Sequence, residues 1–270
     1  AKITGIGFHV PERVVTNQDL EKIMNTSDEW IKERSGIIER RWVEDESNAS
    51  ILAIEAAKNA LEDAAVTAAD VELIICATLT SDYFFPGISN QLQHTLGMGK
   101  IGAFDIKAAC SAFVYALSIG DQFIRTDQYK TILVVGAEVQ STALDLSDDG
   151  RNISVLFADG AGAAILQTSN NETGILSTHL HSDGKYLKEL WCEAPGTSNN
   201  PRLSKRILDE GKHLPYMNGR EVFKNAIVRF PQVIQEALDT NNLTIDDVAQ
   251  IIPHQANNRI SEAVARRMGV

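Results

Sequence analysis

One segment of the chain occurs twice, and this repeat constrains the fold more than any other feature. An offset of 177 positions carries the first copy onto the second without a gap, matching Ala60-Leu61-Glu62, Val66-Thr67, Asp70-Val71 and Ile74-Ile75 to Ala237-Leu238-Asp239, Leu243-Thr244, Asp247-Val248 and Ile251-Ile252. Helix-turn-strand units of similar polarity recur in many α/β folds, so coincidence is the alternative to duplication. Duplication predicts two related α/β halves, which we place at residues 1–168 and 169–270.

The hydrophobic pattern around the repeat alternates between strands and helices. Short runs rich in β-branched residues predict buried strands over 72–76, 131–135, 163–166 and 249–252. Apolar residues three and four positions apart predict helices over 50–65, 111–126, 219–239 and 257–268. The stretch 193–215, with its prolines, glycine and asparagines, is predicted to be an irregular loop. This alternation is typical of layered α/β proteins.

The composition argues against several classes of protein. No apolar run approaches the roughly 20 residues that a membrane-spanning helix needs, and the first residues lack a signal-peptide pattern, so we expect a cytoplasmic protein that does not enter a membrane. A formal net charge of -11 without a long basic run disfavours nucleic acid as a partner. The three cysteines, Cys76, Cys110 and Cys192, are irregularly spaced, which suggests neither a disulfide framework nor a zinc site. His179 and His181 lack a third ligand, so no metal is predicted.

Cys110 lies where a strand-like run passes into the helix predicted from residue 111. At a helix N-terminus the dipole stabilises a thiolate, and unpaired backbone N–H groups can meet negative charge on a carbonyl oxygen under attack. The small neighbours Ala108, Ala109 and Ala112 leave room for a substrate. Cys110 is therefore a candidate nucleophile, and the alternative is a buried cysteine that serves only as a small apolar side chain.

His254 directly follows the predicted strand that ends the second copy of the repeat. Sites in open α/β sheets assemble at the carboxyl ends of strands. A neutral histidine there can donate a hydrogen bond to a thioester oxygen or act as a base, and an ordinary pKa of about 6.5 suits both roles. A solitary structural histidine is the alternative.

Cys110 and His254 lie in segments that resemble signatures of β-ketoacyl-acyl carrier protein synthase III, a family of condensing enzymes with the thiolase fold. The matching segments are Ala108-Ala109-Cys110-Ser111-Ala112-Phe113, residues 156–163, residues 174–184 and Pro253-His254-Gln255-Ala256-Asn257, together with residues 11–17 and 26–31 near the N-terminus. They follow one another in order from one end of the chain to the other. The resemblance implies a thiolase-like α/β fold of two related layered halves, the second of them incomplete at its C-terminus.

The family's reaction assigns roles to these residues. An acyl group passes from acyl-CoA to the cysteine, malonyl-acyl carrier protein enters, and decarboxylation produces a carbanion that attacks the acyl-cysteine to give a 3-oxoacyl-acyl carrier protein. The resemblance thus implies an acyltransferase that carries out the initiating condensation of fatty-acid synthesis, with acetyl as the expected priming group. Cys110 is the implied nucleophile, and His254 is implied to stabilise the enolate oxygen. No cofactor is implied, because acyl-CoA is a substrate.

The resemblance also assigns binding residues. Trp30, Arg34 and Arg151 match positions that contact CoA. Trp30 and Arg34 are four residues apart on a helix that Thr26 and Glu29 open in capping-box spacing, so both can face one ligand, and an ordinary surface helix is the alternative.

Two further sets of positions follow from the resemblance. Those that match the surface for the acidic carrier protein are Lys224, Gln255, Ala256, Asn257, Asn258 and Arg259, and isolated solvated charges are the alternative. Phe85 and Ala112 match the acyl pocket. The implied assembly is a homodimer in which the loop 84–87 closes part of the partner's pocket.

The sequence also departs from the family pattern. The family continues with a segment that supplies a catalytic asparagine and a late glycine-rich loop, and neither motif occurs in these 270 residues. By the repeat, Val270 corresponds to Gln93, whereas the first half continues to about Leu166. We therefore expect a protein that ends at Val270 to be a poor condensing enzyme, and the active natural protein to extend further. Ala112 stands where the family usually has glycine, and its methyl group is expected to narrow the acyl pocket.

Other functions remain as alternatives. They are a synthase III-like enzyme of secondary metabolism, such as polyketide synthesis, and a non-catalytic scaffold or binding subunit. A degradative thiolase is disfavoured because Cys192 lies in no motif that would make it a second catalytic cysteine. Acylation of Cys110 by acyl-CoA would separate an enzyme from a scaffold, and dependence on malonyl-acyl carrier protein rather than malonyl-CoA would separate fatty-acid priming from polyketide synthesis.

Overall fold

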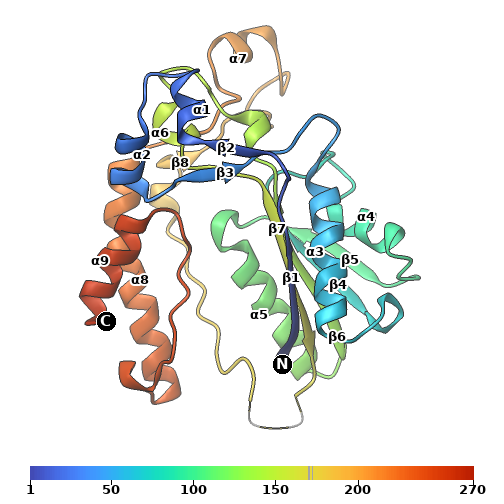
Figure 1. Cartoon of the computed structure of the whole chain (residues 1–270). Coiled ribbons are helices and arrows are strands. Elements are labelled where there is room, and N and C mark those ends of the chain that lie inside the picture. Colours follow the sequence, from blue (N-terminus) through green and yellow to red (C-terminus); the bar gives the residue numbers. More distant parts are fainter. Residues whose placement is uncertain (170, 172) are drawn as a thin grey trace. The chain divides into compact units, whose positions relative to one another are not determined.

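The structure is a computed structural model that describes residues 1–169, 171 and 173–270 (Figure 1). The chain forms two compact units that alternate along the sequence. The first unit comprises Ala1–Val14, Arg41–Val139 and Ala158–Leu180, and the second comprises Val15–Arg40, Gln140–Phe157 and His181–Val270. These units are defined by contacts in space rather than by the repeat, so the division at residue 168 stays a prediction.

The first unit is built on a mixed five-stranded sheet with strand order β1-β7-β6-β4-β5. Its strands are β1 (Lys2–His9), β4 (Leu73–Ala77), β5 (Gly102–Ile106), β6 (Thr131–Glu138) and β7 (Gly160–Gln167). β4 pairs in parallel with β5 and β6, and β7 pairs antiparallel with β6 and β1. A parallel strand is covered on both faces, which explains why all five residues of β4 are apolar and buried. The strands predicted over 72–76, 131–135 and 163–166 are confirmed.

Helices cover both faces of this sheet. They are α3 (Ala49–Asp63), α4 (Ile88–Thr95) and α5 (Ala112–Arg125), with short 3-10 turns at η1 (Ala68–Asp70) and η2 (Ala109–Ser111). The 3-10 turn η3 (Ser141–Ala143) belongs to the second unit. Because successive strand residues point to opposite faces, Ile74 packs in the apolar cluster of α3, and Ile75 packs in that of α5. At Gly7 a Cβ atom would lie 2.3 Å from the Ala56 carbonyl oxygen, so only glycine lets β1 lie directly on the alanine-rich α3. The helices predicted over 50–65 and 111–126 are confirmed.

The second unit is mainly helical. Its helices are α1 (Asn17–Glu21), α2 (Asp28–Ser35), α6 (Arg151–Ser154), α7 (Lys205–Asp209), α8 (Gly219–Asn241) and α9 (Asn258–Met268), with η4 (Gly184–Tyr186) and η5 (Ile245–Asp247). The short strands β8 (Leu190–Trp191) and β9 (Tyr216–Met217) pair antiparallel, and β2 (Val14–Thr16) pairs with β3 (Glu39–Arg41). α9 packs against α8 and α2 (Figure 1). No helix in the described part of the chain is long and apolar enough to span a bilayer.

Polar caps set where several of these helices begin. The side chains of Ser27, Ser204, Asn218 and Asn257 accept backbone N–H bonds at the starts of α2, α7, α8 and α9. Each cap satisfies a donor that has no partner within its helix. The helices predicted over 219–239 and 257–268 are confirmed as α8 and α9.

Three local predictions are wrong. Residues 249–252 are irregular rather than a strand, and Ile252 is 78% exposed, because no strand among the described residues pairs with this segment. The cap of α2 is Ser27 and not Thr26, since the Ser27 hydroxyl accepts the Trp30 N–H at 3.1 Å. The predicted loop 193–215 contains the short helix α7, which the Ser204 cap starts.

Candidate active site

Cys110 lies in the 3-10 turn η2 between β5 and α5. α5 itself begins at Ala112, so the cysteine precedes the helix by two residues rather than starting it. Ala109 has φ of 48°, a left-handed conformation that is unfavourable for a residue with a Cβ atom. The Ser111 hydroxyl donates to the Ala108 carbonyl oxygen at 2.9 Å and closes the turn. The turn therefore presents Cys110 as an exposed residue just before α5.

The position of Cys110 follows from the parallel strands. Ala77, the last residue of β4, is in register with Ile106 of β5 and with Gly136 of β6. The carboxyl ends of the three strands therefore meet at one edge of the sheet, where sites in α/β proteins assemble. Cys110 follows β5 at this edge.

Glu138, the last residue of β6, is a carboxylate that the sequence arguments missed at this edge. It accepts hydrogen bonds from the Leu79 N–H at 2.7 Å and from the Thr80 hydroxyl at 2.6 Å. The Thr80 oxygen in turn accepts the Val139 N–H at 2.8 Å. Burial raises the pKa of Glu138, and these hydrogen bonds oppose that rise. A carboxylic residue three positions after the strand predicted over 131–135 was the available signal.

Glu138 also affects the candidate nucleophile. Partial burial of the sulfur raises the pKa of the Cys110 thiol, and the negative charge of Glu138 raises it further. The expected stabilisation of a thiolate by the helix is therefore outweighed in this structure. Acylation of Cys110 requires a group that removes the thiol proton, because the thiolate is the nucleophile.

The loop between β4 and α4 carries the predicted pocket residue Phe85. Asp105 of β5 accepts the Ile88 and Ser89 N–H groups at 2.8 and 2.9 Å and thereby caps α4. A Cβ atom at Gly87 would lie 2.4 Å from this carboxylate, so glycine is required there. Phe85 is 79% exposed and packs edge-to-face with Phe84.

Ala112, the other predicted pocket residue, is buried in the apolar cluster between α5 and the sheet. Phe85 and Ala112 thus lie in very different surroundings, one presented to the outside and one inside the core. Their assignment to an acyl pocket stays a prediction.

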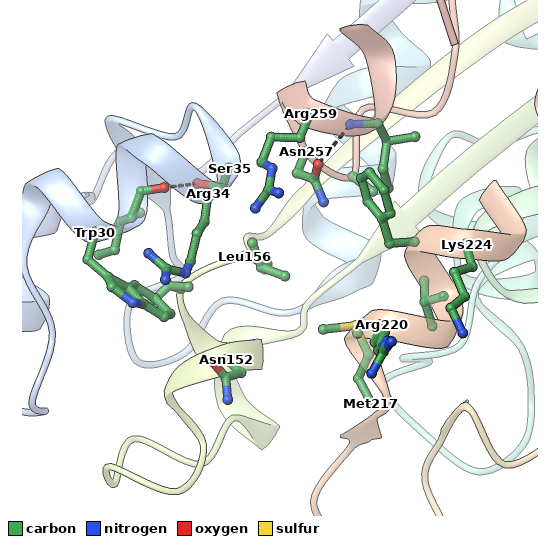
Figure 2. Close-up of a pocket in the computed structure, with 17 residues that line it drawn as sticks. Trp30, Arg34, Ser35, Asn152, Leu156, Met217, Arg220, Lys224, Asn257 and Arg259 are labelled. Carbon is green, nitrogen blue, oxygen red and sulfur yellow. Dashed lines mark hydrogen bonds between the residues drawn. The ribbon is translucent and has the colours of Figure 1, made fainter. Parts of the chain in front are cut away.

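The second unit contains a pocket of about 650 Å³. Residues of α2, α8 and α9 line it, together with residues of α6 and the segment that follows α6 (Figure 2). Four of the lining residues are basic, namely Arg34, Arg220, Lys224 and Arg259, and none of the described residues that line it is acidic. A pocket with this charge suits an anionic ligand.

The Trp30 indole ring, which lines this pocket, lies close to two guanidinium groups, and of these two arginines only Arg34 belongs to the pocket lining. The guanidinium carbons of Arg34 and Arg151 lie 4.6 and 4.7 Å from the centroid of the Trp30 ring, and Figure 2 shows Trp30 and Arg34 side by side on α2. Arg151 also donates to the Asn25 carbonyl oxygen at 2.6 Å. The structure thus brings together the three predicted CoA-contacting residues. An aromatic face beside fixed cations can stack a flat heterocycle and attract phosphate.

The residues predicted to meet the carrier protein divide into two groups. Lys224, Ala256, Asn257 and Arg259 line the pocket, whereas Gln255 and Asn258 do not. Asn257 also caps α9 by accepting the Ile260 N–H at 3.0 Å, and Asn258 donates to Glu262 at 2.6 Å. Arg259 lies over the Phe223 ring at 5.8 Å.

Three polar lining residues were missed from the sequence, Ser35, Arg220 and Asn152 (Figure 2). Arg220 is four residues before Lys224 on α8, so helical spacing was the signal for it. Asn152 immediately follows Arg151 in the one-turn helix α6, which the periodicity did not reveal.

His254 belongs to the second unit and follows the irregular segment that ends the second repeat copy. Partial burial lowers the pKa of its imidazole below the usual 6.5. The ring is therefore neutral at pH 7, which is the state that both predicted roles require.

The structure also shows the surroundings of His179, His181, Cys76 and Cys192. His179 bonds Ser177 at 2.8 Å, and His181 bonds Glu236 at 2.6 Å. In the described part of the chain, no group of three or more His, Cys, Asp or Glu side chains could hold a metal ion. Cys76 is fully buried in β4, and Cys192 is exposed, with its sulfur 3.1 Å from the Ala194 carbonyl oxygen.

Comparison with known proteins gives consistent matches. The sequence model of 3-oxoacyl-[acyl-carrier-protein] synthase III matches residues 104–184, which include Cys110. The β-ketoacyl-[acyl-carrier-protein] synthase III of Xanthomonas campestris pv. campestris (strain 8004) is 46% identical over 271 residues, which cover 99% of this chain and 80% of that protein.

Solved structures agree with the sequence comparison. The crystal structure of 3-oxoacyl-[acyl-carrier-protein] synthase III from Aquifex aeolicus VF5 is 40% identical with a TM-score of 0.90, covering 100% of this chain and 81% of the other. The priming β-ketosynthase from the R1128 polyketide biosynthetic pathway is 32% identical with a TM-score of 0.89, covering 100% of this chain and 78% of the other. The predicted thiolase-like α/β fold is confirmed by these similarities.

Proposed function

Because this chain belongs to the β-ketoacyl-acyl carrier protein synthase III family, we propose that it catalyses the initiating condensation of fatty-acid synthesis, with Cys110 as its acyl-accepting nucleophile. The observation that carries this assignment is the place of Cys110. It is exposed in a 3-10 turn at the carboxyl edge of the sheet, within the segment that the family's sequence model matches. The lower identity of the polyketide ketosynthase supports fatty-acid priming over secondary metabolism.

The first proposed step transfers an acyl group from acyl-CoA to the cysteine. The adenine stacks beside Trp30, and the cations Arg34 and Arg151 attract the phosphates of CoA. The Cys110 thiol loses its proton to a base, and its sulfur attacks the thioester carbonyl carbon. A tetrahedral oxyanion forms next to the turn, whose backbone N–H groups supply hydrogen bonds, and CoA leaves as the carbon–sulfur bond breaks.

The second proposed step brings in malonyl-acyl carrier protein. The acidic carrier protein meets the basic side chains of Lys224 and Arg259, together with Gln255, Ala256, Asn257 and Asn258. Loss of carbon dioxide from the malonyl group leaves an enolate, and neutral His254 donates a hydrogen bond to its oxygen. The enolate carbon attacks the acyl-cysteine, the Cys110 thiolate leaves, and the product is a 3-oxoacyl-acyl carrier protein.

Finer parts of the proposal concern the substrate and the assembly. Acetyl is the proposed priming group, acyl-CoA acts as a substrate rather than a bound cofactor, and Phe85 and Ala112 are the proposed contacts of the acyl chain. The high exposure of Phe85 supports a homodimer in which a second copy covers this loop. A monomer at micromolar concentration would contradict the dimer without affecting the assignment of Cys110.

The function is tested by labelling the protein with a panel of acyl-CoAs and measuring the masses of the cysteine peptides. We expect one acyl group on Cys110, with acetyl transferred fastest. Cys110→Ser should abolish the label, whereas the matched variant Cys192→Ser, at another exposed cysteine, should keep it. A label on Cys76 or Cys192 in Cys110→Ser would overturn the assignment.

The second substrate is tested with the acetylated protein. Product formation with malonyl-acyl carrier protein but not with malonyl-CoA is expected for fatty-acid priming. Efficient use of malonyl-CoA would favour the polyketide alternative, and acylation without any decarboxylation would contradict a condensing enzyme.

A further inference from the structure

Arg40 is a charged side chain that is almost completely buried in the second unit. It is 4% exposed, and it lies outside the pocket lining. Within the described part of the chain it forms no ion pair, and burial lowers the pKa of its guanidinium. A charge buried without a carboxylate partner is costly, so its hydrogen bonds must hold it firmly in place.

The guanidinium connects three separate segments. Its Nη1 donates to the Val15 carbonyl oxygen at 3.1 Å, and its Nη2 donates to the Asn17 side-chain oxygen at 2.7 Å and to the Val155 carbonyl oxygen at 3.1 Å. Val15 belongs to β2, Asn17 begins α1, and Val155 follows α6 and lines the pocket. The planar fork of an arginine presents donors at fixed angles, so these three acceptors are held at set positions.

Asn17 extends this connection to both ends of α2. Asn17 is fully buried, and its amide nitrogen donates to Asp28 and to the Ile37 carbonyl oxygen, each at 2.8 Å. Asp28 is the first residue of α2, and Ile37 lies just beyond its end. Arg40 thus reaches, through one buried amide, the helix that carries Trp30 and Arg34.

Arg40 also reaches α6, through its hydrogen bond to the Val155 carbonyl oxygen. Val155 directly follows this helix, and the helix carries Arg151, which lies over the Trp30 ring. The two segments that supply the indole and its neighbouring guanidinium are therefore joined by one buried cation. No other buried arginine occurs among the described residues.

We propose that Arg40 is a positioning residue for the nucleotide end of acyl-CoA: through Asn17 and Val155 it sets the separation of α2 and α6, and with it the geometry around the Trp30 ring. This inference rests on the proposed function for the identity of the ligand. A purely structural role, in which Arg40 supports the unit without shaping the ligand site, is the competing explanation.

The test compares Arg40→Met with Arg41→Met. Arg41 is adjacent in sequence, but it is only half-buried, and its guanidinium bonds the Pro11 and Glu12 carbonyl oxygens, so it is a matched control. Calorimetry should show CoA binding about tenfold weaker in Arg40→Met, the loss expected when a stacking and cation contact is displaced, and unchanged in Arg41→Met.

A second readout separates positioning from general damage. Acylation of Cys110 by acetyl-CoA should slow about tenfold in Arg40→Met, whereas acylation by S-acetyl-N-acetylcysteamine, a thioester that lacks the nucleotide, should be unchanged. Equal losses with both donors would overturn the proposal. Normal CoA binding without acylation of the wild-type protein would contradict the proposed function while leaving the Arg40 comparison valid.

Arg40→Lys provides a variant that keeps the buried charge if the methionine variant does not fold. A single ammonium lacks the fixed fork, so CoA binding should still weaken about tenfold although the urea midpoint stays near that of the wild type. Wild-type affinity in Arg40→Lys would overturn the proposal, as would a wild-type protein that does not bind CoA.

Discussion

In the first copy of the repeat α3 ends near a left-handed residue, Ala65 with φ of 53°, and in the second copy α8 ends at the equivalent left-handed residue, Asn242 with φ of 54°. Both copies also form the same backbone hydrogen bond directly after this residue. The Val66 N–H donates to the Leu61 carbonyl oxygen at 3.1 Å, and the equivalent bond of the second copy, to the Leu238 carbonyl oxygen, measures 2.9 Å.

The turns that follow are equally similar. Asp70 accepts the Thr67 N–H at 2.8 Å and the Thr67 hydroxyl at 2.7 Å, and Asp247 accepts the same two groups of Thr244 at 2.8 Å each. Both copies then enter a single 3-10 turn, η1 and η5. Bonds between residues a few positions apart therefore reproduce one conformation in two different surroundings.

After these turns the copies diverge. Ile75 is fully buried in β4, whereas its equivalent Ile252 is 78% exposed and belongs to no strand. The first copy ends on the buried Ala77, and the second ends on His254, which follows Pro253. Ile75 is buried because β4 lies between β5 and β6 in a sheet that α5 covers, so the comparison teaches that the turn is a local property and the strand is not.

The largest effect is expected when His254 is replaced by the residue that the first copy carries at this position, alanine. His254→Ala should slow malonyl decarboxylation by about a hundred- to a thousandfold, because an oxyanion donor is lost. Acylation of Cys110 by acyl-CoA should remain, and both rates can be followed by mass spectrometry. Since burial lowers the pKa of His254, wild-type decarboxylation should be lost only as the pH falls below 6.5. A variant that decarboxylates at the wild-type rate would remove His254 from the mechanism.

The next largest effect concerns burial in the two copies. Ile75→Ala should lower the free energy of unfolding by about 3 kcal/mol, because it leaves a cavity beneath α5. Ile252→Ala should change it by less than about 0.5 kcal/mol, because this side chain is already exposed. Urea denaturation measures both values. Similar losses in the two variants would show that the second segment is buried like the first.

A smaller effect is expected from the two turn carboxylates. Hydrogen bonds from Thr67 and Thr244 lower the pKa of Asp70 and Asp247 below the usual 3.8. A carboxylate with a lowered pKa stabilises the fold above its unfolded-state pKa, and this contribution is lost as the pH falls through the folded-state value.

Asp70→Asn and Asp247→Asn should therefore lower the urea midpoint at pH 7 by similar amounts, and the difference from the wild type should shrink as the pH falls below 3.8 and vanish below the lowered folded-state pKa. Replacing the neighbouring Asp246, for which no such bonds to Thr244 occur among the described contacts, is the control. A loss in only one of the two variants would break the equivalence of the turns.

The smallest effect is expected at the left-handed position. Asn tolerates this conformation better than Ala, so Ala65→Asn should stabilise the first turn, and Asn242→Ala should destabilise the second, each by about 1 kcal/mol. Thermal unfolding of the two variants measures both changes in stability. Changes of the same sign would mean that contacts beyond the turn outweigh its backbone preference.

The core elements of the fold could be predicted because their patterns are strong. β4, β6, β7 and the helices α3, α5, α8 and α9 lie where runs of apolar residues or helical spacing predict them. β1 was missed because it is an edge strand whose residues alternate in exposure and include Gly5 and Gly7. The structure shows that these two glycines let α3 approach the strand closely.

Some parts of the candidate site could be predicted from the sequence, and others could not. Trp30 and Arg34 could be paired from their spacing on one helix, and Cys110 from its place between a strand and a helix. The approach of Arg151 to Trp30 and the buried connection from Arg40 to Asn17 and Val155 could not be derived from spacing, because these residues lie far apart in the chain.

The sequence by itself determined the two equivalent turns and placed Cys110 and His254 in segments that resemble the family's signatures, because such features depend on a residue and its near neighbours. Only the tertiary structure decided that Ile75 is buried while Ile252 is exposed, that Glu138 raises the pKa of Cys110, and that the buried Arg40 bonds both Asn17 and Val155. Burial, charge proximity and strand pairing need partners that the chain brings together only by folding.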